Sequence, residues 1–252
     1  MGLQAFDLTG KVALVTGANT GLGQGIALAL AEAGADIAAA GIVPADETGD
    51  KVRSLGRKFV NIDANLMSIE PCARIVAETI GGLGGLDILV NNAGLIRRAD
   101  AVEFSEKDWD DVMNVNIKGA FFMAQAAGKH MIDRGYGKII NIASMLSFQG
   151  GIRVPSYTAS KSGIAGITRL LANEWGAKGI NINAIAPGYM ATDNTAQLRA
   201  DEDRSKAILD RIPAGRWGIP ADLGGTAVFL AATASDYVNG AVIPVDGGWL
   251  AR

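Results

Sequence analysis

The sequence has 252 residues, with 23 Lys and Arg against 26 Asp and Glu, and the net charge of -3 gives no field that would favour nucleic acid or an anionic membrane. A single cysteine, Cys72, allows no intramolecular disulfide, and a single histidine, His130, leaves no Cys/His cluster of metal-ligand spacing, so no metal is expected. The length suits one α/β domain with a large core, and residues 1–252 are expected to form a single domain with small-molecule partners.

Short runs rich in Val, Ile, Leu and Ala alternate along the chain with longer segments of helical period. The predicted strands, in chain order, are residues 11–16, 36–41, 59–63, 87–91, 138–143, 181–186 and 241–245. Alternation of this kind is typical of an α/β fold in which a doubly wound parallel sheet carries helices on both faces. The sequence therefore predicts a parallel sheet of seven strands.

Local signals refine this outline. Ser105 with Asp108 three residues later is a capping-box-like spacing that predicts the start of a helix. Pro244 cannot donate to a sheet ladder, which places the last strand at an edge. Residues 192–218 are polar and helical but interrupt the alternation of strands and helices, so they are expected to form a small helical lid inserted in the domain.

The chain shows no sign of membrane insertion or export. No apolar run is long enough to span a bilayer, and the first eight residues lack the basic segment and apolar run of a signal peptide. A cytoplasmic protein without membrane or nucleic-acid partners is expected.

A glycine-rich turn follows the first predicted strand. Residues 16–23 read Thr-Gly-Ala-Asn-Thr-Gly-Leu-Gly and lead into an apolar helix over residues 26–33. Glycines at such a turn allow the backbone to approach a pyrophosphate, and the exposed amides of the helix start favour an anion. The spacing differs from G-x-G-x-x-G, and a plain βα turn is the alternative, but adenine-nucleotide binding is the better interpretation.

The end of the second predicted strand bears on which dinucleotide binds. It reads Gly-Ile-Val at residues 41–43, with no carboxylate for a ribose hydroxyl and no cation for a 2′-phosphate. Asp36 precedes this strand and would lie at the wrong end of the sheet, whereas Asp46 or Glu47 could substitute unless they are simply solvated. The absence of a cation favours NAD over NADP.

Tyr157 and Lys161 are four residues apart at the start of a predicted helix, so their side chains share one face. A nearby ammonium is expected to lower the pKa of the phenol, which would let Tyr157 act as an acid/base near neutral pH. Ser144 follows the fifth strand and lies at the same carboxyl edge as the glycine turn, where its hydroxyl can bind a reacting oxygen. Asn116, inside a helix, is expected to hold Lys161 and a water for proton relay.

These residues together resemble the short-chain dehydrogenase/reductase family over nearly the whole chain. The motifs that carry the resemblance are Thr16-Gly17-x-x-x-Gly21-x-Gly23, Asn91-Asn92-Ala93-Gly94, Asn116, Ser144, Tyr157-x-x-x-Lys161 and Pro187-Gly188. The resemblance implies a Rossmann-type fold, a homotetramer, and a catalytic tetrad of Asn116, Ser144, Tyr157 and Lys161, with Lys161 also binding the nicotinamide ribose. The implied cofactor site comprises Gly17, Asn19, Thr20, Gly21, Leu22, Gly23, Ile42, Asn65, Leu66, Asn92, Ala93, Gly94, Tyr157, Lys161, Pro187, Gly188, Met190 and Thr192. The family often has Asp-Leu or Asp-Val after its third strand, where this chain has Asn65 and Leu66.

Arginines near the predicted site suggest an anionic, hydroxylated substrate, because the guanidinium can bond both oxygens of a carboxylate. Arg153, between Ser144 and Tyr157, is the preferred candidate among Arg97, Arg98, Arg153, Arg199, Arg211 and Arg216. The predicted substrate-binding set is Ser144, Gln149, Arg153, Arg97 and Trp217. Longer strings, such as residues 95–98, 144–157, 212–218 and 246–252, resemble family members that act with NAD(H) on keto-deoxy sugar acids from the breakdown of pectin.

Several alternatives remain open at this point. Within the family, the rivals are a gluconate 5-dehydrogenase and a 3-oxoacyl-carrier-protein reductase, and the latter would normally want a cation near Ile42. Outside it, a nucleotide-sensing protein could share the fold without turnover, but Ser144, Tyr157 and Lys161 argue against that. A serine hydrolase is excluded because the sequence has no G-x-S-x-G motif.

Overall fold

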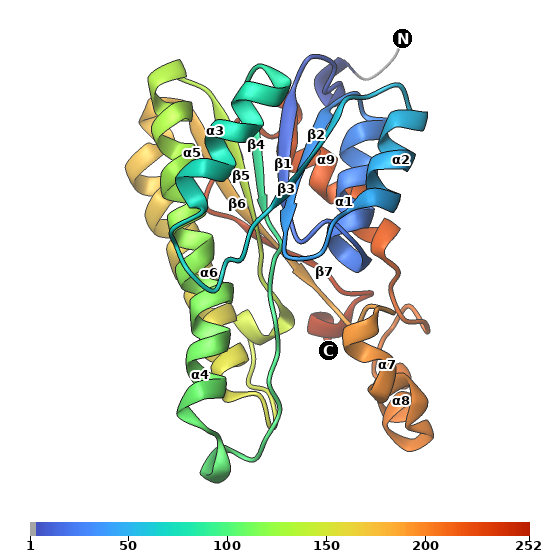
Figure 1. Cartoon of the computed structure of the whole chain (residues 1–252). Coiled ribbons are helices and arrows are strands. Elements are labelled where there is room, and N and C mark those ends of the chain that lie inside the picture. The colour runs from blue at the N-terminus through green and yellow to red at the C-terminus, as the bar shows by residue number, and fades with distance from the viewer. Residues whose placement is uncertain (1–3) are drawn as a thin grey trace.

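The computed structural model describes residues 4–252, so the first three residues of the expected domain lie outside it. Seven parallel strands form one sheet in the order β3-β2-β1-β4-β5-β6-β7 (Figure 1). The strands are β1 Val12–Thr16, β2 Asp36–Gly41, β3 Phe59–Asp63, β4 Ile88–Asn91, β5 Gly137–Ile142, β6 Ile180–Pro187 and β7 Val242–Val245. Each end lies within one residue of its predicted position, so the predicted doubly wound parallel sheet is confirmed.

Helices cover both faces of this sheet. They are α1 Gly21–Glu32, α2 Asp46–Ser54, α3 Cys72–Leu83, α4 Glu106–Met113, α5 Ala120–Arg134, α6 Pro155–Trp175, α7 Ala196–Ala200, α8 Glu202–Leu209 and α9 Gly224–Ala231. Ala13 and Val15 of β1 pack in a core with α1 and α9, whereas Leu14 packs in the opposite core with α3, α5 and α6. Because both sets of side chains are buried, the strands read as continuous apolar runs rather than alternating ones.

The strand order reverses beside β1, which pairs with β2 on one side and β4 on the other. In an open parallel sheet, the crevice beyond the carboxyl ends of the strands at such a reversal is the usual place for a ligand. In Figure 1 this edge of the sheet faces the bottom of the view, where α4 on one side and α7 with α8 on the other extend beyond it.

Residues 192–218, where a helical lid insertion is predicted, are joined at their base. Met190 and Gly218 form a parallel bridge, with hydrogen bonds from the Ala191 amide to the Gly218 carbonyl at 2.7 Å and from the Gly218 amide to the Tyr189 carbonyl at 2.9 Å. The insertion carries α7 and α8 between these two anchored ends. Two smaller expectations are also confirmed: Ser105 caps α4 by accepting a hydrogen bond from the Asp108 amide, and β7 with Pro244 is an edge strand.

Across residues 4–252, no helix is both long enough and apolar enough to cross a membrane. Within the same range, no three His, Cys, Asp or Glu side chains come together as ligands for a metal ion would.

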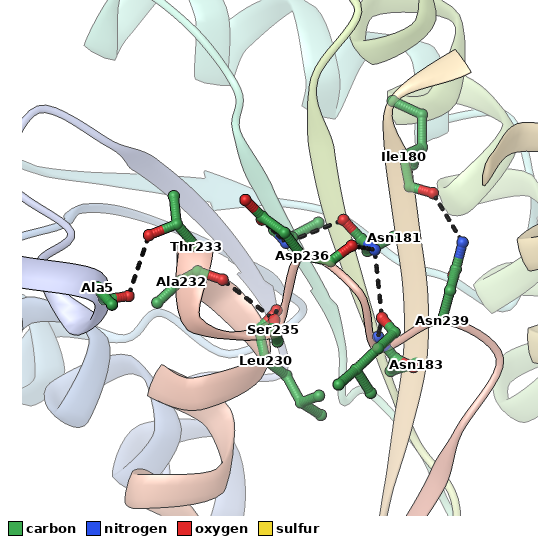
Figure 2. A network of polar contacts seen from close by, with 12 residues as sticks. Ala5, Ile180, Asn181, Asn183, Leu230, Ala232, Thr233, Ser235, Asp236 and Asn239 are labelled. Atoms are coloured by element: carbon green, nitrogen blue, oxygen red, sulfur yellow. Dashed lines mark hydrogen bonds and ion pairs between the residues drawn. The ribbon is translucent and has the colours of Figure 1, made fainter. Parts of the chain in front are cut away.

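The amino-terminal edge of the sheet, opposite the crevice, is held by a polar network around the loop before β7 (Figure 2). Asn181 donates to the Asp236 carbonyl at 3.0 Å, and Asn183 donates to the Val238 carbonyl at 2.9 Å. The Lys138 side chain is only 1% exposed, and its Nζ donates to Asn181 Oδ1 at 2.9 Å and to Asp236 Oδ1 at 2.7 Å. These bonds tie the segment before the edge strand β7 to the start of β6, with which β7 pairs.

Replacing Lys138 tests whether this network stabilises the fold. Lys138→Met keeps the apolar stem but leaves Asn181 and Asp236 without their buried donor, so the free energy of unfolding in urea should fall by about 1 to 3 kcal/mol. Lys178→Met, which removes an exposed lysine, is the control and should unfold as the wild type does. An unchanged unfolding midpoint for Lys138→Met would mean that the network contributes nothing to stability.

Candidate functional site

A cavity of about 1060 Å³ opens at the carboxyl edge of the sheet. Every residue of the predicted cofactor site lines it except Met190, and it also contains Ser144, Tyr157 and Lys161 of the predicted tetrad. Met190 instead lines a smaller cavity of about 210 Å³ at the base of the insertion, against Gly218 and Asp222. The larger cavity exceeds the size that a single small ligand needs, so a dinucleotide and a small substrate can share it.

The glycine-rich turn between β1 and α1 forms one wall of this cavity. Gly17 and Gly21 have φ angles of 65° and 58°, a left-handed conformation that favours glycine. A Cβ atom on Gly23 would overlap the Gly17 carbonyl oxygen and Asn92 Nδ2, so this position also requires glycine. The turn thus leaves a bare backbone cradle at the start of α1, where exposed amides can bind a phosphate. The residues present fit a dinucleotide.

Hydrogen bonds join the ends of β1 and β4 beside this cradle. Thr16 Oγ1 accepts from the Asn92 amide at 3.0 Å and from the Ala93 amide at 2.9 Å. Asn92 Nδ2 donates in return to the carbonyls of Thr16 at 2.9 Å and Gly17 at 3.0 Å. Asn92 therefore acts within the site as the support of the glycine turn.

The cavity wall after β2 is apolar. Ile42 is 63% exposed and lines the cavity together with Val43 and Leu66. Asp36 lies at the opposite end of β2, as predicted, where its carboxylate accepts from the Lys58 amide, and Glu47 forms an ion pair with Lys51. No carboxylate or cation therefore follows the end of β2 at this wall.

Tyr157 and Lys161 lie in the first turns of α6, which begins at Pro155, a residue suited to the first helical position. Lys161 is buried and its Nζ donates to the Ile142 carbonyl at 2.6 Å, so the ammonium is held at the end of β5. It lies 5.6 Å from the centroid of the Tyr157 ring. Ser144 lies close enough to Tyr157 to lower the pKa of the phenol, so the phenol, the hydroxyl and the ammonium line one part of the cavity.

The charges of this group differ from the expectation in one respect. The sequence predicts that Lys161 lowers the pKa of Tyr157, but burial raises the pKa of this phenol, while the Ser144 hydrogen bond and the charge of Arg98 lower it. Burial also lowers the pKa of Lys161 to about 8. The reason is that both groups lie in a poorly solvated place, where each charged form is disfavoured.

Asn116 lies in a π-helical turn, Asn114–Gly119, between α4 and α5. Such turns are rare and frequent at functional sites. Its Oδ1 accepts from the Leu95 amide at 2.9 Å, while its Nδ2 donates to the Leu95 carbonyl at 2.9 Å and to Ser160 Oγ at 3.2 Å. Asn116 thus joins the segment after β4 to the start of α6, while the predicted hold on Lys161 and a water stays a prediction.

The predicted substrate residues are only partly at the cavity. Arg153 lines it with a left-handed φ of 64°, but its Nε is paired with Asp100 at 2.9 Å. Arg97 does not line it, because its guanidinium turns to the carboxylates of Asp108 and Asp111 in α4. Both arginines therefore form ion pairs with aspartates that no sequence motif indicates as their partners.

Of the other two predicted substrate residues, Gln149 lines the cavity and Trp217 does not. Gln149 lines the cavity, and its Oε1 accepts from Trp249 Nε1 at 3.3 Å. Trp217 lies behind the wall with its ring edge-on to Tyr189, at 5.6 Å between centroids.

Residues outside the predicted substrate set also line the cavity, among them Arg98, Arg204, Arg211 and Trp249. Arg98 NH2 donates to the Asn194 carbonyl of the insertion at 3.2 Å. The positive charge of Arg98 lowers the pKa of Tyr157. Trp249 comes from the last residues of the chain. The string Asp-Gly-Gly-Trp, with glycines that permit a sharp turn, is the one sequence signal that could have indicated it.

Comparison with known proteins agrees with this geometry. Residues 17–250 match the family described as enoyl-(acyl carrier protein) reductase. The chain is 67% identical to 2-dehydro-3-deoxy-D-gluconate 5-dehydrogenase of Escherichia coli strain K12 and 66% identical to that of Dickeya dadantii strain 3937, covering 99% of each chain in both cases. A crystal structure from Agrobacterium tumefaciens, described as a candidate 2-deoxy-D-gluconate 3-dehydrogenase with bound NADP, is 59% identical with a TM-score of 0.92, over 98% of this chain and 99% of that one.

Removing the Arg98 charge tests the electrostatics around Tyr157. Because Arg98 lowers the pKa of Tyr157, Arg98→Gln should raise it and leave less phenolate near neutral pH. The rate of alcohol oxidation, which needs the phenolate, should fall roughly 3- to 10-fold at pH 7 and recover at higher pH. Initial rates of NAD(P) reduction between pH 6 and about 10 measure this.

Arg98→Lys keeps the charge and is the matched control, so its pH profile should stay close to that of the wild type. A pH profile for Arg98→Gln that coincides with the wild-type profile would show that Arg98 does not act on Tyr157.

Proposed function

Since the chain belongs to the short-chain dehydrogenase/reductase family, we propose that it interconverts the ketone and the secondary alcohol of a keto-deoxy sugar acid, with 2-dehydro-3-deoxy-D-gluconate as the type. It is an NAD(P)-dependent dehydrogenase that acts on CH–OH groups. The observation that carries the proposal is the meeting of Tyr157, Ser144 and Lys161 beside the glycine cradle in one cavity. The identity to sugar-acid dehydrogenases along the whole chain supports the substrate class.

The cofactor would be held by the glycine cradle at the start of α1, by the turn at Asn92 and by Lys161. When bound, the nicotinamide ring supplies or accepts the hydride. Ser144 and Tyr157 then hold the reacting oxygen between them by hydrogen bonds. In oxidation, Tyr157 accepts the hydroxyl proton as the carbon loses its hydride and the ketone forms, and in reduction it donates that proton.

Lys161 lies beside the residues that carry out this exchange. Its ammonium is fixed to the Ile142 carbonyl and lies near the Tyr157 ring, so it would bind the nicotinamide ribose beside the phenol. Asn116 positions the start of α6, which carries both residues, through Ser160. The role of Asn116 is therefore one of positioning, while Tyr157 transfers the proton.

NAD is the proposed physiological cofactor, although the related Agrobacterium protein was crystallised with NADP. The wall after β2 presents Ile42 and Val43 where a 2′-phosphate would need a cation. An uncompensated phosphate dianion against apolar side chains is disfavoured, so the adenosine without that phosphate should bind better.

A homotetramer is the proposed assembly, in keeping with the family resemblance. Large apolar side chains are half-exposed on two helices, Trp109 on α4 and Leu170 on α6, and a Cβ on Gly166 of α6 would meet no other atom. The edge strand β7 offers a further unpaired face. Sedimentation velocity at micromolar protein concentration should give the mass of four chains, and a monomer under these conditions would refute the assembly.

A substrate panel tests the proposed reaction and cofactor together. Keto and hydroxy sugar acids, a gluconate and a 3-oxoacyl thioester are offered with each cofactor, and nicotinamide absorbance is followed. The keto-deoxy sugar acid with NAD(H) should give the highest kcat/KM. Preference for gluconate or the thioester would favour those rival members of the family, and preference for NADP(H) would refute the cofactor proposal.

Tyr157→Phe is the matched variant because it removes only the hydroxyl oxygen. Its turnover should fall by at least about 10². Cofactor binding, followed by quenching of protein fluorescence, should remain. Turnover that survives the substitution would contradict the acid/base role.

A further inference from the structure

The cations of the large cavity are not equivalent. Arg153 is engaged by Asp100, and Lys161 is engaged by the Ile142 carbonyl. Arg98 lies close enough to Tyr157 to lower the pKa of that phenol. Arg204 and Arg211 are the remaining lining cations, and within residues 4–252 no carboxylate lies within ion-pair distance of either.

Arg211 differs from Arg204 in lying over an aromatic ring. Its guanidinium carbon lies 3.9 Å from the centroid of the Trp249 ring. A guanidinium over an aromatic face is attracted by the ring and keeps the N–H groups at its edge available for hydrogen bonds. A planar fork that is already oriented loses little freedom when it binds both oxygens of a carboxylate.

Contacts of Trp249 place this stack at the substrate end of the cavity rather than at the adenine end. Its Nε1 donates to Gln149 Oε1, and Gln149 lies five residues after Ser144 in the same loop. Its ring also packs against Tyr189, at 4.7 Å between centroids, directly after the Pro187-Gly188 pair that ends β6. The adenine end, by contrast, is the wall at Ile42.

The chain terminus is built to hold Trp249 in this place. Asp246 accepts from the amides of Gly248 and Leu250, both at 2.9 Å, so its carboxylate closes the final turn. The Ala214 amide donates to the Gly247 carbonyl at 2.9 Å, which joins the terminus to the segment that follows Arg211. Trp249 is 5% exposed and packs with Ile208 and Ile212 on either side of Arg211 in sequence.

We infer that Arg211, whose guanidinium lies over the Trp249 ring, binds the carboxylate of the substrate and so determines specificity for sugar acids, with Gln149 and Trp249 as its positioning residues. This inference rests on the proposed function. In a 2-dehydro-3-deoxy-D-gluconate that reacts at its fifth carbon, the carboxylate is about 5 Å from the reacting carbon in the extended chain.

Arg211→Gln tests the inference through a split between KM and kcat. Loss of a charge-assisted hydrogen-bond pair should raise KM for the sugar acid roughly 10- to 100-fold, while kcat at saturation changes by less than about threefold. Arg211→Lys keeps the charge but not the planar guanidinium, so its KM for the sugar acid should lie between those of the wild type and Arg211→Gln. Calorimetry of the sugar acid binding to the protein–NADH complex should show the same loss, and NADH affinity should not change.

The corresponding neutral carboxamide distinguishes binding of the carboxylate from general damage. Wild type and Arg211→Gln should turn over the carboxamide with the same KM, because this substrate has no carboxylate for Arg211 to bind. Lys206→Gln removes the same charge from an exposed position of α8 outside the cavity and should behave as wild type with both substrates. Trp249→Phe, which loses the bond to Gln149, should raise KM for the acid alone.

Two results would overturn the inference. One is a wild-type KM for the sugar acid in Arg211→Gln, and the other is a rise in KM that appears in Arg204→Gln instead. Absence of wild-type activity toward every sugar acid would refute the proposed function itself, and is a separate outcome seen before any variant is made.

Discussion

The hydrogen bonds between Thr16 and the Asn92 turn are the constraint on which the site depends. They join the carboxyl ends of β1 and β4 where the strand order reverses, and they hold open the glycine cradle. A parallel sheet brings all its carboxyl ends to one edge, so residues far apart in sequence, such as Gly17, Ser144 and Gly188, line one cavity. These bonds between the ends of β1 and β4 therefore fix the position of the glycine turn relative to the rest of the cavity.

Positive charges are divided among separate tasks along this edge. Lys161 is held at the end of β5, Arg98 lowers the pKa of Tyr157, and Arg211 lies over the Trp249 ring. Burial disfavours the phenolate and the ammonium alike, because it raises the pKa of Tyr157 and lowers the pKa of Lys161. The polar network around Lys138 lies at the opposite edge and serves the fold alone.

The sequence predicts the strands and the catalytic group well for a physical reason. Strand runs and the spacing of Tyr157 and Lys161 are local patterns, and the parallel topology converts a position at a strand end into a position in the site. The choice among arginines is not local. Arg97 and Arg153 are engaged by Asp111 and Asp100, and Arg211 meets Trp249 only because the chain terminus folds back beside the insertion. The burial that raises the pKa of Tyr157 cannot be predicted from the sequence either, because it depends on all the segments that surround the cavity.

A crystal structure of the protein with NAD and 2-dehydro-3-deoxy-D-gluconate tests the central claim most directly. The account predicts that the reacting oxygen lies within hydrogen-bond distance of Ser144 Oγ and the Tyr157 hydroxyl, with both carboxylate oxygens on the Arg211 guanidinium. A substrate whose carboxylate lies on Arg153 or in solvent, or whose reacting oxygen lies away from Tyr157, would contradict it.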